Sequence, residues 1–313
     1  RSSDLVVAVK GREISEEDVS RALEAAKAIV IPSDREIIHT YTQDFKVDNT
    51  DRVKDPIGMF GVRLEVRVHI VTGNISLIQN LVKCVEATGI HVENITLQPI
   101  ASSHSVLTDE ERNMGVALVD IGGGTTDLAI WKNGSLIHSQ IIPVGGNHFT
   151  NDLACALNVS AVEAERIKVQ YGHVLAEQLN QSAHISAQGL SGTKPKEIRL
   201  SLVANVLGAR AEELYEIIQG IFKDNDLSEH VAGGIVLTGG GALIKGLAPM
   251  GEYLLGKSIK IGYPIPFGGM TNIMQNPKFS TVLGLLIESN NRASYIKDHH
   301  KEMSFDVIGK LRD

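Results

Sequence analysis

Several kinds of residue and segment are scarce in this sequence, and each scarcity excludes a class of protein. Its 313 residues include two cysteines, too few and too isolated for a disulfide framework or a zinc site, so we expect a reducing cytoplasm. No apolar run approaches membrane-spanning length, and no secretory leader is visible. The formal net charge of −7 argues against a nucleic-acid partner, because phosphate backbones need a basic footprint. The eleven histidines show no metal-ligand spacing.

Apolar residues and glycine, in contrast, are plentiful. With 43% hydrophobic residues the chain can bury substantial cores, and its length favours two or more compact parts. Among the 30 glycines are two runs of three, each of which follows a short apolar segment. These two runs are the strongest functional signals in the sequence.

The first glycine run lies in residues 116–131, which read VALVDIGGGTTDLAIW. Short apolar segments flank it, so a hairpin of two buried strands is predicted. Consecutive residues without Cβ bring backbone N–H groups against an anion, and two threonine hydroxyls add donors. The candidate phosphate contacts are Gly122, Gly123, Gly124, Thr125 and Thr126. An ordinary hairpin whose glycines serve only the turn is the alternative interpretation.

Asp120 stands at the head of this loop, where its carboxylate would repel a bare phosphate. A Mg²⁺ ion between the two removes the conflict, because hard cations bind carboxylate and water oxygens. Asp120 is therefore the predicted metal residue, acting through water.

The second glycine run follows the apolar residues 235–238 and precedes a helix-like stretch. A helix N-terminus behind a glycine turn offers a nucleotide close backbone approach and a favourable dipole. Neither run fits the Rossmann or P-loop pattern, so those two folds lose support. The candidate contacts here are Gly239, Gly240, Gly241 and Ala242.

Residues 120–127 and 238–242 resemble the second phosphate loop and the adenosine loop of the actin, Hsp70 and sugar-kinase superfamily. Two further segments occur in the order of that superfamily: residues 98–102 resemble its first connecting helix, and residues 164–172 its nucleotide-gripping helix. The resemblance implies an α/β, actin-like (ribonuclease H-like) ATPase fold that binds ATP and Mg²⁺.

The same resemblance assigns roles to individual residues. Gln98 would face the attacking water, and because an amide is a poor general base, any hydrolysis is expected to be slow. Glu165 and Lys168, three apart on a predicted helix, would hold the ribose and adenine. The turn beside the nucleotide would comprise Gly145, Gly146 and Asn147, for which a plain helix start is the alternative.

Within the superfamily the chain resembles the FtsA family of bacterial cell-division proteins along nearly its whole length. The segments that carry this narrower resemblance are 54–59 (KDPIGM), 69–73 (HIVTG), 142–146 (IPVGG) and 282–286 (VLGLL). It implies that residues 1–73 form an additional small α+β subdomain of the 1C type, also described as SHS2-like.

The residues of this opening segment predict such a unit independently. Ser15 and Asp18 approximate a capping box before a helix that places Val19, Leu23, Ala26 and Val30 on one face. Residues 62–70 alternate apolar side chains with polar ones, which predicts a half-buried strand. Its wet face would carry Arg63, Glu65, Arg67 and His69.

The remaining division follows the family. Residues 74–144 would form subdomain 1A, incomplete and rejoined by about 275–290; residues 145–160 and 226–274 subdomain 2A; residues 161–225 subdomain 2B; and residues 291–313 a linker with an amphipathic tail. Within 1A we expect an amphipathic helix at 74–87 carrying Leu77, Leu81 and Val85, then a strand at 90–97. No counterpart of the family's first phosphate segment precedes Arg1, so half a phosphate clamp is expected.

The resemblance implies an ATP-binding scaffold that self-assembles and tethers FtsZ filaments to the inner membrane. Subdomain 2B would bind the FtsZ C-terminal tail, with Arg210 facing the partner or, alternatively, paired with Glu213 or Glu212. The 1C-type unit would bind other divisome proteins. The tail, with Met303, Val307, Ile308 and Leu311 at helical spacing, would lie on the cytoplasmic face of the membrane at the septum; a disordered tail is the alternative interpretation.

Two other functions stay open on the sequence alone. The related pilus-assembly protein PilM is an actin-like scaffold with the same extra subdomain. A small-metabolite kinase of the same superfold is the second alternative, although no carboxylate base beside an acceptor pocket can be identified.

Overall fold

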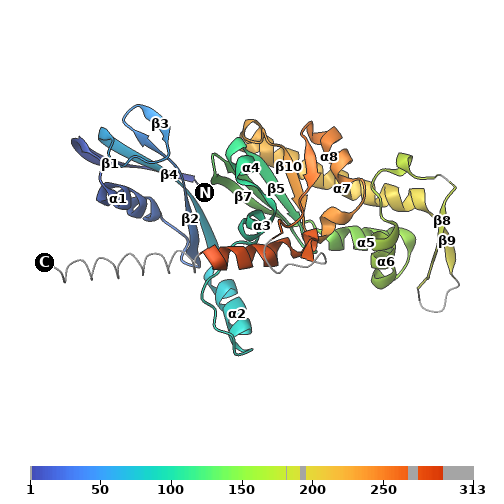
Figure 1. Cartoon of the computed structure of the whole chain (residues 1–313). Helices are drawn as coiled ribbons and strands as arrows, with labels where there is room; N and C mark the ends of the chain where they lie inside the picture. Colours follow the sequence, from blue (N-terminus) through green and yellow to red (C-terminus); the bar gives the residue numbers. More distant parts are fainter. Residues whose placement is uncertain (1, 181, 191–194, 267–273, 292–313) are drawn as a thin grey trace.

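The computed structural model describes residues 2–180, 182–190, 195–266 and 274–291. An α+β unit at the N-terminal end lies beside a five-stranded sheet that has helices on both faces (Figure 1). A two-stranded hairpin, β8–β9, lies at the opposite end of the molecule (Figure 1). The predicted tail after residue 291 lies outside the described residues.

The α+β unit is a four-stranded antiparallel sheet with the strand order β1-β4-β2-β3. Helix α1 packs against one face of this sheet and encloses a separate apolar core. The elements are β1 (Ser2–Glu13), α1 (Glu16–Lys27), β2 (Arg35–Val47), β3 (Thr50–Val53) and β4 (Phe60–Asn74).

Helix α1 begins where its residues predict. Ser15 and Asp18 form the capping box, and Arg12 donates to the buried Asp18 carboxylate at 2.8 Å. Ala26 is buried on the predicted face, but Val30 is 95% exposed. The prediction for Val30 is wrong because α1 ends at Lys27, before the chain reaches it.

From Leu64 onward strand β4 shows the predicted alternation, with Leu64, Val66, Val68 and Ile70 buried, but Val62 at the start of the predicted segment is 59% exposed. His69 is the exception on the wet face, because it is 4% exposed. Its Nε2 lies 3.0 Å from the Ser139 hydroxyl of β7 (Ser135–Ile142), where the α+β unit meets the larger sheet. Gln43 of β2 also joins the α+β unit to the larger sheet, because its side-chain amide donates to the carbonyl of Ile137 in β7 at 3.1 Å. This end of the face therefore contacts protein, not solvent.

Burial lowers the pKa of His69 from its ordinary 6.5 to about 4. Below pH 6.5 the unfolded chain takes up a proton on the His69 imidazole, whereas the folded protein does not do so until the pH falls to about 4. The free energy of unfolding should therefore fall by roughly 2–3 kcal/mol as the pH drops across this window. Urea unfolding of His69→Gln should show a flatter pH dependence, whereas His91→Gln, at an exposed histidine, should match the parent. Identical slopes for His69→Gln and the parent would contradict this assignment.

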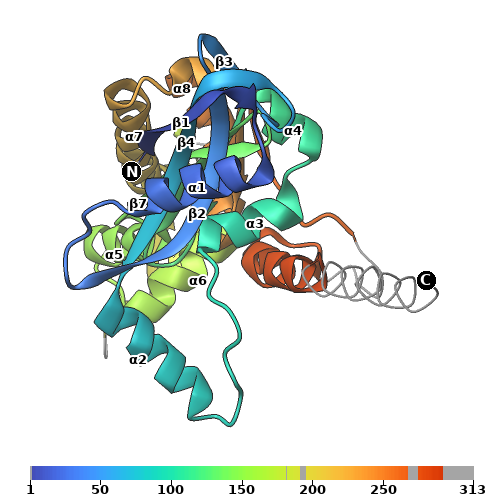
Figure 2. The same cartoon turned by 90° about the vertical axis from the view of Figure 1, so that its left-hand side faces the viewer.

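Residues 75–97 only partly follow the expectation. Helix α2 (Ile75–Glu86) forms, and the side chain of Asn74 accepts from the amide of Leu77. Its apolar face is exposed, with Leu77 70% accessible, and Figure 2 shows α2 projecting away from both sheets. The strand predicted at 90–97 is absent: residues 90–97 are irregular, since no described strand lies alongside to pair with them.

The larger sheet is mixed and has the order β11-β10-β5-β6-β7. Strands β5, β10 and β11 are parallel neighbours, whereas β5, β6 and β7 form an antiparallel meander. The additional strands are β5 (Val116–Ile121), β6 (Thr126–Lys132), β10 (Ile235–Thr238) and β11 (Ile259–Ile261). The hairpin predicted in residues 116–131 is thus confirmed.

Strand β5 is buried on both faces, which explains its continuous apolar sequence. Ala117, Val119 and Ile121 belong to one core, and Val116 and Leu118 to the other. The first core is covered by α5 (Gly146–Leu157), α7 (Leu200–Asp224) and α8 (Leu247–Leu255), and the second by α3 (Gln98–Val106), near α4 (Asp109–Met114). Beyond α5 lie α6 (Ala161–Tyr171), β8 (His184–Ala187) and β9 (Lys196–Arg199).

The sheet crosses the boundary that the sequence prediction placed between residues 144 and 145. Strands β5–β7 were assigned to subdomain 1A, yet they share one sheet and one core with β10 and β11. The division into four named subdomains stays a prediction. Within the described residues, no helix is both long and apolar enough to cross a bilayer.

Candidate functional site

The two glycine runs follow neighbouring parallel strands and therefore emerge at the same edge of the sheet. In the register of β5 and β10, Asp120 is the partner of Thr238. Gly239 follows at φ 83°, and a Cβ there would lie 2.4 Å from Asp120 Oδ1 and 2.5 Å from the carbonyl oxygen of Ile121. Glycine is required at this position both by its conformation and by the close approach.

A third glycine turn, at residues 145–147, is hydrogen-bonded to the first glycine run. The amide of Gly146 donates to the carbonyl of Gly122, and that of Asn147 to the carbonyl of Gly123, both at 2.8 Å. Gly145 makes this contact possible, because a Cβ there would lie 2.7 Å from the Gly123 carbonyl oxygen. The hydroxyl of Thr126 donates to Val144 at 2.7 Å and ties the base of the hairpin to the same segment.

The tips of these turns face solvent, while their bases are buried. Gly123, Gly124, Asn147 and Gly240 are exposed, and Thr125 is half-buried. Gly241 and Ala242 are buried in the short 3-10 helix η3 (Gly240–Leu243). The second run therefore continues into a 3-10 turn before α8 begins at Leu247.

Asp120 is buried under the hairpin and accepts several hydrogen bonds through one oxygen. Its Oδ2 accepts from Ser102 at 2.6 Å, from the Gln98 amide at 3.3 Å and from Thr281 at 3.4 Å. Burial nevertheless raises the pKa of Asp120. Gln98, at the start of α3, thus lies beside the hairpin, and its role toward an attacking water stays a prediction.

Asp127 lies directly opposite Asp120 in the β5–β6 register, and the sequence prediction gave it no role. Burial, followed by the charge of Asp120, raises the pKa of Asp127 to about 6. A divalent cation relieves this repulsion, so the donor set suits Mg²⁺. The described residues contain no group of three or more metal-binding side chains, so such an ion would take its other ligands from water and phosphate.

Glu165 and Lys168 of α6 differ in accessibility. The Glu165 side chain is 47% exposed, whereas that of Lys168 is 10% exposed. The Lys168 ammonium donates to the Gly146 carbonyl at 2.9 Å and to the Thr150 hydroxyl at 2.8 Å, and pairs with Glu165 at 2.7 Å. Lys168 therefore contacts the Gly145–Asn147 turn from within the protein, whereas Glu165 contacts Lys168 and Thr150.

Two neighbours of the glycine runs were missed by the sequence prediction. A Cβ on Gly240 would lie 3.9 Å from Lys278 Cβ, in the 3-10 helix η5 (Pro277–Phe279). Thr281, which donates to Asp120, is the second of the helical residues 280–291. Both are distant from the glycine runs along the chain, and nothing in their local sequence indicates the contact.

Arg210 is not part of this cluster. It lies on α7, where its guanidinium donates to Asp152 of α5 at 2.6 and 2.9 Å and also pairs with Glu213. The alternative interpretation, pairing with Glu213, is confirmed. These bonds hold α5 to α7, and the partner-binding role of Arg210 stays a prediction.

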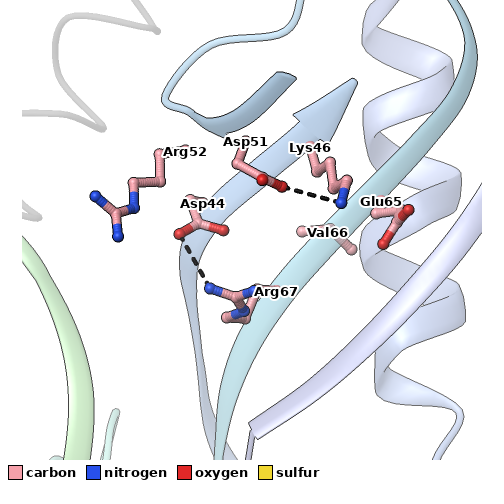
Figure 3. Close-up of a pocket in the computed structure, with 7 residues that line it drawn as sticks. All are labelled: Asp44, Lys46, Asp51, Arg52, Glu65, Val66 and Arg67. Carbon is pink, nitrogen blue, oxygen red and sulfur yellow. Dashed lines mark ion pairs between the residues drawn. The ribbon is translucent and has the colours of Figure 1, made fainter. Parts of the chain in front are cut away.

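The hollow shown in Figure 3 is separate from the glycine turns. It measures about 310 Å³ and lies on the α+β sheet between β2, β3 and β4. Charges of both signs line it, with Lys46 paired to Asp51 at 3.1 Å and Arg67 to Asp44 at 3.5 Å. Because the charges are balanced and largely paired, this hollow lacks the anion-binding character of the glycine turns.

Comparison with known proteins places this geometry in a family. Residues 117–284 match the family model described as cell division protein FtsA, and residues 1–72 match the SHS2 domain inserted in FtsA. The chain belongs to the FtsA family. The FtsA match includes the hairpin, the Gly145 turn, α6 and the second glycine run, and the SHS2 match corresponds to the α+β unit.

Curated FtsA proteins are similar along most of the chain. The protein from Pseudomonas aeruginosa is 39% identical over 282 residues, which cover 90% of this chain and 68% of that protein. FtsA from Borreliella burgdorferi is 40% identical over 93% of this chain and 71% of its own length. FtsA from Escherichia coli K12 is 34% identical, with 90% and 69% covered.

Solved structures confirm the predicted actin-like fold. The PilM–PilN type IV pilus biogenesis complex matches with a TM-score of 0.61 and 16% identity, covering 92% of this chain and 76% of that one. MreB5 of Spiroplasma citri, bound to ADP, matches with a TM-score of 0.57 and 21% identity, covering 72% and 68%. At these identities the likeness concerns the fold alone, and the family relationship is with FtsA.

Proposed function

We propose that this chain is an ATP-binding, actin-like cell-division scaffold that self-assembles and tethers FtsZ filaments to the inner membrane. The observation that carries the proposal is the meeting of three glycine turns at one sheet edge, beside a buried carboxylate pair, in a chain of the FtsA family. Anion-binding turns next to acidic residues suit a nucleotide phosphate carried with a cation.

Each part of the cluster has a distinct task in this proposal. The hairpin tip, Gly122–Thr125, would receive the phosphates, and Asp120, through water, with Asp127 would hold Mg²⁺, which neutralises phosphate charge when bound. Glu165 accepts from the ribose hydroxyls, and the segment 239–242 lies against the adenosine. Gln98 orients a water molecule, and its amide gives only slow turnover.

Nucleotide binding would act on assembly, because a ligand that contacts several turns favours the conformation in which they meet. We assign self-assembly and FtsZ binding to this chain on the basis of family membership, with the FtsZ tail on residues 161–225 and later divisome proteins on the α+β unit. The membrane contact is assigned to the segment after residue 291, at the cytoplasmic face of the septum.

Co-sedimentation with lipid vesicles tests the proposal. Vesicles of anionic bacterial lipid are mixed with the 313-residue chain, FtsZ and either MgATP or no nucleotide, and FtsA from Pseudomonas aeruginosa serves as the reference. We expect the chain to pellet FtsZ with the vesicles, and MgATP to increase the amount. FtsZ that stays in the supernatant with this chain, while the reference recruits it, would contradict the tethering role.

A further inference from the structure

Four buried hydroxyl groups connect α3, the end of β10 and the helical residues 280–291. They belong to Ser102, Ser105, Thr238 and Ser280, each of which is at most 1% exposed. Burying a hydroxyl is costly unless it is hydrogen-bonded, and every one of the four has a partner within 2.8 Å. Ser102 differs from the other three, because its partner is the carboxylate of Asp120.

The bond between Ser102 and Asp120 fixes the direction of a second bond. A serine hydroxyl has one hydrogen, and at 2.6 Å from Asp120 Oδ2 this hydrogen is donated to the carboxylate, which only accepts while it is ionised. The Ser102 oxygen therefore accepts from the Thr281 hydroxyl, which lies 2.9 Å away. The result is a chain of donors that runs from Thr281 through Ser102 to Asp120.

The two oxygens of the Asp120 carboxylate are used differently. Oδ2 accepts from Ser102, and the Gln98 amide and the Thr281 hydroxyl lie 3.3 and 3.4 Å from it. Oδ1 makes no hydrogen bond to any residue that the structure describes. Hydrogen bonds to a carboxylate are stronger than those between neutral groups, so the donors on Oδ2 oppose rotation of the carboxylate and leave Oδ1 for another ligand.

We infer that Ser102 and Thr281 are positioning residues for the cation site: they hold Oδ2 of Asp120 and so present Oδ1 to the hydrated Mg²⁺ ion of a bound nucleotide. The inference rests on the proposed nucleotide-binding function. Thr281 lies 161 positions beyond Asp120 in the chain, so its part in the site is visible only in the fold. Removing an outer-shell partner of this kind typically lowers metal affinity by roughly 10- to 100-fold.

Isothermal titration with MgATP, and with ATP in the presence of EDTA, separates cation positioning from nucleotide contacts. Ser102→Ala should weaken MgATP binding about tenfold, because the carboxylate loses its closest donor, and should change the binding of metal-free ATP less than about twofold. Thr281→Val should weaken MgATP in the same direction, and Thr281→Ser, which keeps the hydroxyl, should restore parental affinity. Equal losses for MgATP and metal-free ATP in Ser102→Ala would overturn the inference.

Ser105→Ala is the matched control on the same helix. Ser105 is also fully buried, and its hydroxyl donates to the carbonyl of Ser280 at 2.7 Å, so it joins the same two helical segments as Ser102. Its removal loosens α3 against residues 280–291 but takes no donor from Asp120, and MgATP affinity should change less than about twofold. A loss as large as that of Ser102→Ala would show that helix packing, and not the orientation of Asp120, sets the affinity, and would also overturn the inference.

Urea unfolding of the nucleotide-free chain tests the bond itself in a double-mutant cycle. Ser102→Ala should lower the folding equilibrium constant about tenfold in the parent, but less than about threefold when Asp120→Ala has already removed the acceptor. Equal factors in the two backgrounds would show that Ser102 does not hold the carboxylate. If the parent binds neither MgATP nor ATP, the proposed function fails, and the cycle still decides whether Ser102 fixes Asp120.

Discussion

Replacing Gly284 with alanine is expected to lower the free energy of unfolding by about 3 kcal/mol or more. Gly284 lies in the helical residues 280–291, where a Cβ would sit 1.7 Å from the carbonyl oxygen of Ala101 in α3. Both sides of this contact are helical backbone, so no side-chain rotation can relieve it. The two helices must separate, which weakens the hydrogen bonds of Ser102 to Asp120 and Thr281.

Gly220→Ala is the matched control in the interior of α7. A Cβ at Gly220 meets nothing within 4 Å, so alanine should stabilise the protein by up to about 1 kcal/mol through its higher helix propensity. Urea unfolding of both variants at neutral pH measures the difference. A Gly284→Ala protein as stable as the parent would show that the close approach of α3 and residues 280–291 is not maintained in solution.

Gly145→Ala is expected to weaken MgATP binding by about a hundredfold, a loss of about 2.7 kcal/mol. A Cβ at Gly145 would lie 2.7 Å from the Gly123 carbonyl oxygen, 2.8 Å from the Thr125 nitrogen and 2.9 Å from the Gly122 carbonyl oxygen. All three atoms belong to the backbone of the hairpin tip. The turn must move away, and the two 2.8 Å bonds from Gly146 and Asn147 break.

Isothermal titration measures this loss, and Gly220→Ala is again the control because α7 carries no predicted nucleotide contact. Far-ultraviolet circular dichroism should show that Gly145→Ala keeps its secondary structure, since the affected bonds join turns and not helices or strands. Binding of MgATP with parental affinity by Gly145→Ala would rule out a phosphate held between these turns.

The features predicted from the sequence are those determined within a few neighbouring residues. The capping box of Ser15 and Asp18 and the hairpin around Gly122–Gly124 depend on local propensity and turn chemistry, and both are present. The glycine runs also indicated the candidate site. Glycines outside helices and strands often mark places where the backbone closely approaches a ligand or another segment.

The features that could not be predicted depend on contacts between distant segments. The sequence shows His69 as one more polar residue in an alternating strand, and its burial follows from the approach of Ser139. The alternation in residues 90–97 looks like a strand, but a strand requires a partner, and none is present among the described residues. The hydrogen bonds of Lys168 to Gly146 and Thr150 join segments that are distant along the chain, so the sequence does not indicate them.

Hydrogen exchange of the parent chain, with and without MgATP, tests most directly whether distant glycine turns enclose one nucleotide. MgATP should slow exchange together in residues 122–125 and 239–242, with half-saturation at the same concentration, and Gly145→Ala should lose both effects. Protection of one segment without the other, or of neither at saturating MgATP, would contradict a shared nucleotide site.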